Sequence, residues 1–352
     1  MKRSFLILLA VSLIVPMVLV GNGQSASKDK TYTLVYSDFR TQHAFTVKGG
    51  VVPWAEAIQK ATGGRVKFEM HPNGTLGSAG DHYEMVYTGV CDVAGPMTEN
   101  SPGRFPLYEM NKLPMLFPSG EVAALVLSDL VDKYMVDTEF KDVKVLWIQA
   151  TPNLQLQLRN KPVKTKEDLK GLKINCDSRV VADTLMALGA VPATMYTPEI
   201  YPSLERGVID GSIFGWEGAI AFKLQEVTRY RTEVNLCVMS WPIMMNLKTW
   251  NSLPADIQQI IEDLSGRERS RIAAAAFEQT EAHLKGLIAG MDKKAGKPGP
   301  YTLTKEERAR WLKAVQPLWY RWAEEKDAKG LPGTKVLEDA LRLIEKYSNK
   351  GS

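Results

Sequence analysis

The chain has 352 residues, 45% of them hydrophobic, which is enough to bury a large core and favours two domains over one. Its formal net charge of +4 falls to +2 once an expected leader carrying Lys2 and Arg3 is removed, and this near-neutral balance argues against a nucleic-acid partner. Three cysteines without a CxxC pair exclude a disulfide framework, although one bridge stays open.

The first 26 residues have the pattern of a targeting segment. Lys2 and Arg3 precede an uncharged run from Phe5 to Val20, and small polar residues follow. We therefore predict a signal peptide over residues 1–26 and export to the periplasm. A retained membrane anchor is less favoured, because the run is shorter than the roughly 20 residues of a spanning helix and contains Pro16.

The next stretch repeats a strand, helix, strand pattern. Residues 31–36 and 66–70 have strand character, and residues 47–61 between them carry apolar side chains at helical spacing. A helix of about ten residues and a third short strand over 91–94 follow. This repetition predicts a parallel sheet flanked by helices.

A proline-rich stretch then leads toward a second lobe. Five prolines between Gly95 and Pro118 alternate with large apolar residues. They predict an irregular but well-packed crossing segment, because proline removes backbone donors and stops helices. Residues 121–134 predict a helix, and residues 143–149 predict a strand that heads toward the second lobe.

The middle of the chain, residues 161–217, is the clearest α/β unit. Three short apolar runs separated by amphipathic segments predict three strands and two connecting helices; the runs cover 172–176, 191–195 and 208–214. In such sheets ligands bind outside the carboxyl ends of the strands. We therefore expect a ligand-binding rim from the residues at these ends, 175–179, 196–198 and 214–217. Cys176 lies on this rim, where a small buried side chain is favoured over a functional thiol.

The remaining chain is expected to close both lobes. Residues 226–246 predict a returning strand shared by the lobes, and residues 255–292 predict one helix of about 38 residues, on the order of 55 Å long. The alternative is two helices broken at Ser265 and Gly266. Residues 305–347 predict helices that pack on the second lobe; their tryptophans are interpreted as core rather than as a ligand cage, and they are Trp311, Trp319 and Trp322.

These elements predict an α/β protein with a two-lobed, periplasmic-binding-protein-like fold, crossing hinge strands and a long helix spanning both lobes. We expect lobe I to comprise residues 27–149, completed by 238–275. Lobe II is expected to comprise residues 150–237, completed by 276–352.

Sequence patterns of catalysis are not visible. The chain lacks glycine-rich phosphate loops, HExxH, GxSxG and Cys/His clusters, and its four histidines are scattered. We expect no enzyme activity, no cofactor and no metal. Two lobes and an export signal instead favour a protein that closes on a solute by hinge motion. An enzyme on the same scaffold is the alternative, and it would need a nucleophile with a base within reach.

Six motifs in order resemble one known family. They are HPNGTLGSA, TGVCDVAG, RFPLYEMNKLPMLFPS, EDLKGLKI, YPSLERGVIDG and NSLPADIQQII. They are similar to the extracytoplasmic solute-binding proteins of tripartite ATP-independent periplasmic (TRAP) transporters, of the DctP type, and the similarity covers residues 31–347. The resemblance implies closure on a small organic acid and delivery to a membrane permease driven by an ion gradient.

One position departs from the family pattern. In the family, the DLKGLKI motif is followed by an arginine that forks onto the ligand carboxylate. This chain has Asn175 there, which has donors but no charge. Either another cation holds the anion or the ligand is not a simple carboxylate. Arg179 is the nearest substitute, and Lys161 and Arg159 are further candidates; each has a plain surface charge as its alternative.

Further site candidates follow from their place at strand ends. Phe214 and Trp216 suggest an apolar or planar ligand surface. Glu217 is expected either to bind an ammonium or hydroxyl group or to cap the following helix. The remaining candidates, from both lobes and the returning strand, are His43, Phe45, Met97, Thr98, Glu99, Tyr196, Thr197 and Trp241.

We therefore expect a monomeric, periplasmic solute-binding component of a TRAP transporter that binds a small organic acid, with an aromatic or heterocyclic ring as one option. The alternatives are an amine or a neutral polar solute, with Glu99 or Glu217 as counter-charge. The same scaffold could also serve as the ligand-sensing partner of a membrane receptor.

Overall fold

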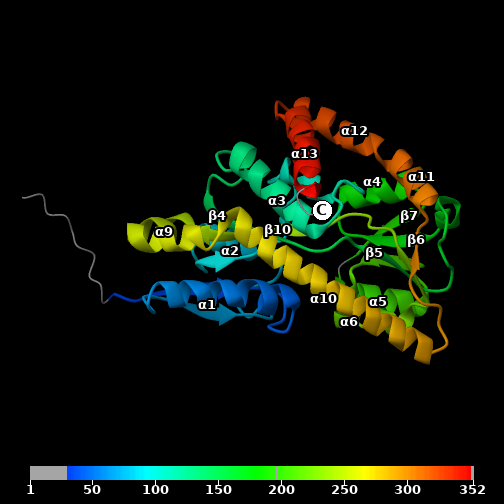
Figure 1. Cartoon of the computed structure of the whole chain (residues 1–352), viewed down its shortest axis with the longest axis horizontal. Coiled ribbons are helices and arrows are strands. Elements are labelled where there is room, and N and C mark those ends of the chain that lie inside the picture. The colour runs from blue at the N-terminus through cyan, green and yellow to red at the C-terminus, as the bar shows by residue number, and fades with distance from the viewer. Residues whose placement is uncertain (1–29, 196, 350–352) are drawn as a thin grey trace, which may run out of the picture. The chain divides into compact units, whose positions relative to one another are not determined.

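Two β-sheets organise the computed structural model, which describes residues 30–195 and 197–349 (Figure 1). The predicted leader and Tyr196 lie outside the described residues. From Thr31 onward the chain folds as one compact unit. No described helix is both long and apolar enough to cross a bilayer.

The first sheet has the strand order β2-β1-β3-β10-β4. Its strands are β1 (Tyr32–Ser37), β2 (Val66–His71), β3 (Val93–Ala94), β4 (Val143–Ala150) and β10 (Ser240–Asn246). β1 pairs in parallel with β2 and β3, whereas β10 is antiparallel to β3 and β4. The helices of this part of the chain are α1 (Val52–Ala61), α2 (His82–Thr88) and α3 (Gly120–Leu130). Short helical segments lie between them and after α3; they are η1 (Thr46–Val51), η2 (Thr98–Asn100), η3 (Tyr108–Lys112) and η4 (Val131–Met135).

The second sheet has the order β11-β9-β5-β8-β6-β7. Its strands are β5 (Gln155–Leu158), β6 (Lys173–Cys176), β7 (Val191–Thr194), β8 (Gly211–Phe214), β9 (Tyr230–Glu233) and β11 (Tyr301–Thr302). β6 is parallel to β7 and β8, as the predicted α/β unit requires. Its connections are η5 (Lys166–Leu169), α4 (Arg179–Ala187), α5 (Thr197–Arg206), α6 (Trp216–Ala221) and α7 (Leu224–Val227).

Crossing segments join the two sheets, as predicted. Thr151 donates its backbone N–H to the Met239 carbonyl at 2.8 Å, and Leu154 donates to the Cys237 carbonyl at 2.8 Å. The proline-rich segment adds a third chain to this crossing, because Met115 donates to the Leu236 carbonyl at 2.6 Å. We call the elements packed around each sheet the first and second lobe.

The predicted long helix is two helices, so the prediction of a single rod over residues 255–292 was wrong and its alternative was right. After the short α8 (Leu247–Ser252), α9 (Ala255–Asp263) ends before Ser265, and α10 (Gly266–Lys294) starts on a glycine at φ +66°. Glycine adopts this left-handed conformation without the penalty of a Cβ atom. The Ser265 hydroxyl also accepts from the Trp54 indole at 3.0 Å, which fixes the break on the first lobe.

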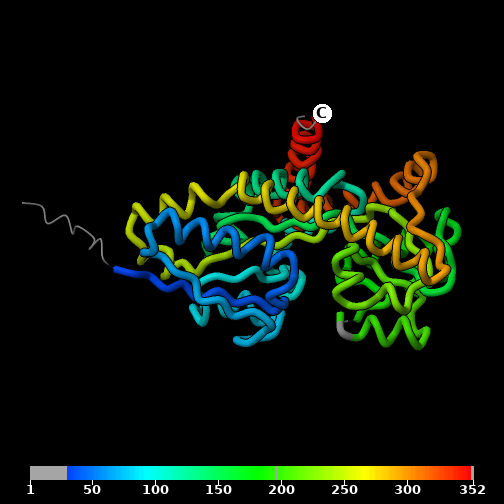
Figure 2. The backbone as a smooth tube through the Cα atoms, turned by 60° about the horizontal axis from the view of Figure 1, so that its bottom comes forward, coloured from blue at the N-terminus to red at the C-terminus, as the bar shows by residue number. Residues whose placement is uncertain are grey.

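α10 alone still spans both lobes. Its 29 residues make a rod of about 44 Å. It packs against α3 and β4 of the first lobe and against α6 of the second. Figures 1 and 2 show this helix, yellow to orange, running alongside both groups of strands.

The C-terminal helices divide between the lobes. They are α11 (Lys305–Val315), α12 (Pro317–Asp327) and α13 (Gly333–Ser348). Trp311 lies in the core of the second lobe, but Trp319 and Trp322 share a core with α3 and α13. This packing of α12 and α13 differs from the expected assignment of residues 276–352 to lobe II. All three tryptophans are buried, and all three cysteines are buried and free.

Candidate ligand-binding site

A paired arginine stands at the carboxyl end of β1. The Arg40 Nη1 lies 3.0 Å from the Asp38 Oδ1, and the Tyr36 hydroxyl donates to Asp38 Oδ2 at 2.6 Å. Asp38 is 2% exposed, and a buried carboxylate is tolerated only when it is paired or hydrogen-bonded. The pair therefore holds the Arg40 guanidinium in one position.

Two aromatic rings and a methionine surround this guanidinium. Its carbon lies 3.9 Å from the centre of the Trp241 ring and 4.3 Å from that of Phe39, both within cation–π range. Arg40 Nη2 approaches the Met97 sulfur at 3.1 Å. We call Phe39, Arg40, Met97 and Trp241 the first rim. The predicted candidates Met97 and Trp241 meet here because β3 and β10 are neighbours in the sheet.

The side-chain amide of Asn175 makes its hydrogen bonds inside the second sheet. It is 5% exposed; its Oδ1 accepts from the Ser212 hydroxyl at 3.2 Å, and its Nδ2 donates to the Met195 carbonyl at 3.4 Å. These bonds tie β6 to β8 and to the end of β7. The amide that stands at the family's arginine position thus stabilises the sheet.

Phe214 and Trp216 have different environments. Trp216 is 4% exposed and lies in a hydrophobic cluster of the second lobe, so it packs as core. Phe214 is half-buried, and its ring covers Gly218 so closely that a Cβ atom there would lie 2.6 Å from the ring. The first lobe has a similar arrangement, because a Cβ on Gly49 would lie 2.6 Å from the Phe45 ring. Neither glycine leaves room for a side chain.

Glu217 does not cap its own helix. The backbone N–H groups of Trp216 and Glu217 donate to the Glu281 carboxylate of α10 at 2.7 and 3.0 Å. Burial raises the pKa of Glu281 to about 7, although these two bonds act in the opposite direction. The expected capping role of Glu217 is therefore filled from another helix.

The surroundings of the Glu217 carboxylate shift its pKa in both directions. Burial raises the pKa of Glu217, while a hydrogen bond from the Phe45 backbone N–H and the positive charge of Arg40 lower it. Glu217 belongs to α6 of the second lobe, and both groups that stabilise its charge belong to the first. We define the second rim as Asn175, Phe214 and Glu217.

A buried lysine makes a second connection between the lobes. Lys112, in the crossing segment, is 2% exposed; its Nζ lies 3.0 Å from Glu99 Oε1 of the first lobe and 2.8 Å from Asp177 Oδ2 of the second. Burial by itself would lower the pKa of Lys112, but Asp177 and Glu99 outweigh burial and raise it. The expected counter-charge Glu99 is therefore already paired.

The other predicted cations lie on the surface. Arg179 is 73% exposed and paired with Glu325 at 3.2 Å. Lys161 is exposed and donates to the Asp168 carbonyl at 2.9 Å, and half-buried Arg159 donates to the Glu205 carbonyl at 3.2 Å. His43 is exposed beside Gln42. These contacts agree with the surface-charge alternative.

Arg40 and Lys112 were missed by the sequence reasoning. Each had a visible signal: Arg40 is a basic residue just after the first strand, and Lys112 is a charge inside an otherwise apolar proline-rich segment. Both signals are common in soluble proteins, so neither identifies a site without its neighbours.

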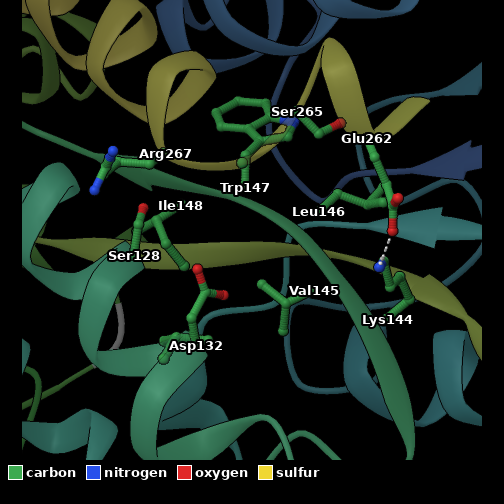
Figure 3. A pocket seen from close by; sticks show the side chains of 12 residues that line it. Ser128, Asp132, Lys144, Val145, Leu146, Trp147, Ile148, Glu262, Ser265 and Arg267 are labelled. Atoms are coloured by element: carbon green, nitrogen blue, oxygen red, sulfur yellow. Dashed lines mark hydrogen bonds and ion pairs between the residues drawn. The ribbon is translucent and has the colours of Figure 1, made fainter. Parts of the chain in front are cut away.

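Two hollows lie away from the rims. One, shown in Figure 3, is lined by β4 and by the break between α9 and α10; Lys144 and Glu262 form an ion pair of 2.6 Å within it. The other lies beside the crossing segments and is lined by Asn153, Gln155 and Glu281, among others. Trp216 lines the second hollow, but Arg40 and Phe214 line neither.

Two α/β lobes joined by hydrogen-bonded crossing segments, each with candidate ligand-binding residues at its strand ends, have the architecture of a two-lobed solute-binding protein. The family model of DctP, the bacterial extracellular solute-binding proteins of family 7, matches residues 40–326. The chain belongs to this family, which confirms the resemblance seen in its motifs, and it is a solute-binding protein of the TRAP type.

Curated and solved relatives agree with this assignment. The C4-dicarboxylate-binding periplasmic protein DctP of Rhodobacter capsulatus is 28% identical over 303 residues, 83% of this chain and 87% of its own. A TRAP solute-binding protein from Rhodoferax ferrireducens, crystallised with copurified benzoate, superposes with a TM-score of 0.84 at 27% identity, covering 92% of this chain and 100% of its own. A marine metagenome TRAP protein specific for aromatic acids, with bound 3-hydroxybenzoate, gives 0.83 at 28% identity, covering 90% and 99%.

Proposed function

We propose that this chain captures a small aromatic acid in the periplasm and delivers it to the membrane permease of a TRAP transporter. One observation carries the choice of ligand: each lobe has a phenylalanine ring laid on a glycine, Phe45 on Gly49 in the first lobe and Phe214 on Gly218 in the second. Such fixed planar surfaces suit an aromatic ligand. The two related structures described above were crystallised with benzoate and 3-hydroxybenzoate.

The charges at the rims favour an acid over an amine. Of the two carboxylates expected as counter-charges for an ammonium group, Glu99 is already paired with Lys112 at 3.0 Å. An amine would have to displace the buried Lys112 ammonium from Glu99, which is costly because a buried charge would lose one of its two partners. An acid would not have to displace Lys112 from Glu99.

Closure supplies the signal for delivery. A ligand that touches both rims stabilises the state in which the lobes are close, by as much as its affinity differs between the closed and open states. The permease is proposed to recognise this closed state. The predicted leader over residues 1–26 supports a periplasmic location.

A thermal-shift panel tests the ligand class. It compares benzoate, 3-hydroxybenzoate and succinate with the amine benzylamine and the neutral benzyl alcohol, on the mature protein freed of bound solute. The aromatic acids are expected to stabilise the fold by about 2.7 kcal/mol at 100 times their dissociation constant, and succinate less. Stabilisation by benzylamine without stabilisation by any acid would contradict the proposal.

Delivery is tested separately in vesicles. The permease subunits are reconstituted with an ion gradient, and uptake of radiolabelled benzoate is followed. Uptake should require this chain; binding of benzoate without any effect on uptake would contradict the transport role.

A further inference from the structure

We propose that Asp177 is a releasable latch between the lobes, which holds them together through the buried Lys112 ammonium and thereby sets how tightly the protein binds its solute. The carboxylate reaches this ammonium from the second lobe, with 2.8 Å between Asp177 Oδ2 and Lys112 Nζ. The latch concerns closure and not the class of ligand, so it goes beyond the proposed function. Only its test with benzoate rests on that function.

Lys112 is anchored in the first lobe. It is the last residue of η3, and two other side chains of η3 are bonded to the first sheet. The Tyr108 hydroxyl lies 3.0 Å from the Ser240 hydroxyl of β10, and the Asn111 amide donates to the Ser240 carbonyl at 3.0 Å. Tyr108 and Met110 also belong to the hydrophobic core that contains residues of α3 and β4. Lys112 therefore moves with the first lobe when the lobes move apart.

The two carboxylates on Lys112 differ in their lobe and in their exposure. Glu99, in η2 of the first lobe, lies 3.0 Å from the Lys112 Nζ, and its side chain is 12% exposed. Asp177 follows β6 of the second lobe, and its side chain is 43% exposed. Separation of the lobes thus leaves the pair with Glu99 intact and breaks the pair with Asp177. Water can solvate the released carboxylate, because its side chain is already partly exposed.

The helix that follows Asp177 does not depend on its carboxylate for capping. α4 begins at Arg179, and the Ser178 hydroxyl accepts from the Val181 N–H at 3.3 Å as the N-cap. Removing the Asp177 charge should therefore leave α4 capped and act mainly on the contact between the lobes.

The buried end of the pair makes the latch stronger than a surface ion pair. Lys112 is 2% exposed, and a buried charge that loses a partner is penalised more than an exposed one. The exposed end, Asp177, makes the latch releasable. A contact that must form and break in each cycle of binding and release needs both properties.

A contact that exists only while the lobes are close shifts the equilibrium toward the closed state. Glu99 and Asp177 follow β3 and β6, and ligands in such folds bind at the carboxyl ends of the strands. Closing on a ligand brings these strand ends together, so ligand and latch favour the same state. The apparent affinity falls in proportion to the fraction of protein in the binding-competent state. Loss of the latch should therefore weaken ligand binding.

The first test is small-angle X-ray scattering of the mature protein without solute. Asp177→Asn should populate states with separated lobes and raise the radius of gyration above that of the parent. Asp142→Asn is the matched control, since this aspartate is 34% exposed and its 3.0 Å pair with Arg104 lies within the first lobe. The control should have the radius of gyration of the parent.

The second test is isothermal titration of benzoate into the same proteins. Asp177→Asn is expected to weaken benzoate binding by roughly 3- to 10-fold, and Asp142→Asn should leave it unchanged. Asp177→Glu, which keeps the charge, should bind benzoate more tightly than Asp177→Asn. Far-ultraviolet circular dichroism checks folding. If Asp177→Asn is unfolded, Asp177→Ser replaces it in both measurements.

The outcomes separate the latch from the proposed function. If neither the parent nor any variant binds benzoate, the ligand class is wrong, and the scattering without solute still tests the latch. An unchanged radius of gyration in Asp177→Asn would overturn the latch, because the lobes would then be held without this carboxylate. Tighter benzoate binding by Asp177→Asn would also overturn it, since Asp177 would then compete with the acid for Lys112.

Discussion

The two rims hold their polar groups in opposite ways. On the first rim a buried carboxylate, Asp38, fixes the Arg40 guanidinium, and the Trp241 ring lies against it. On the second rim the amide of Asn175 is consumed by bonds inside the sheet, and the nearest arginine, Arg179, points to solvent. The comparison teaches that the partners of a polar group at a strand end decide whether it is held beside aromatic rings or bonded inside the sheet.

The largest expected loss of stability follows from replacing Lys112, the buried lysine that connects the lobes. Lys112→Met removes the cation shared by Glu99 and Asp177, and it should destabilise the fold by about 3 to 5 kcal/mol because a buried carboxylate loses its partner. Urea unfolding measures this. Lys133→Met, which removes an exposed lysine paired with Asp339, is the control and should cost less than about 1 kcal/mol. Equal losses in both variants would contradict a link between the lobes.

The next prediction concerns how protonation of Glu281, whose carboxylate binds the backbone behind the second rim, makes the stability of the fold depend on pH. Burial raises the pKa of Glu281 from 4.5 to about 7, so the folded state keeps a proton that the unfolded chain has released between these values. The stability that this proton contributes is present at low pH and is lost as the pH rises toward 7, by roughly 3 kcal/mol in total.

Glu281→Gln isolates this effect from the other buried carboxylates. The unfolding free energy of the parent, minus that of the variant, should fall between about pH 4 and about pH 8. Urea unfolding at several pH values measures the difference. A difference that does not change with pH would show that Glu281 titrates normally.

Asn175→Arg restores the charge that the family pattern places on the second rim. The buried site has no room for the longer side chain, so we expect a loss of about 1 to 3 kcal/mol in stability. The ratio of benzoate to succinate affinity should also change, as titration of both acids would measure. An unchanged ratio would show that Asn175 lies outside the ligand site.

The smallest expected effect concerns the rings. Gly218→Ala forces the Phe214 ring to shift, which should cost about 1 kcal/mol and weaken benzoate several-fold. Gly290→Ala, on the open face of α10, is the matched control and should stabilise the helix by up to about 1 kcal/mol. Calorimetric melting measures the stability of the two variants, and titration measures their affinity for benzoate. Equal stability and equal affinity in both variants would contradict a role of the Phe214 ring in binding.

Much of the fold could be predicted because its helices and strands have recognisable local sequence patterns. The strands of the α/β unit, such as residues 173–176 and 211–214, are apolar runs with glycines at their ends. The break at Gly266 was visible only as an alternative, since a glycine inside a helical pattern costs little by itself. What decides it is the Trp54 indole bonded to Ser265, a contact across more than 200 positions.

The site was predicted less completely for the same reason. Met97 and Glu217 were proposed from their positions at strand ends and Trp241 from the returning strand, and they stay predictions. Whether an arginine faces solvent or another rim depends on its partners, and the partners of Arg40 come from three separate strands and their loops. Nothing in the local sequence distinguishes Arg40 from Arg179.

A crystal structure of the mature protein with benzoate tests the central claim most directly. We predict that benzoate is enclosed between the two lobes, with its ring against the Phe45 or the Phe214 ring. Benzoate bound outside the two lobes, or away from both rings, would contradict it.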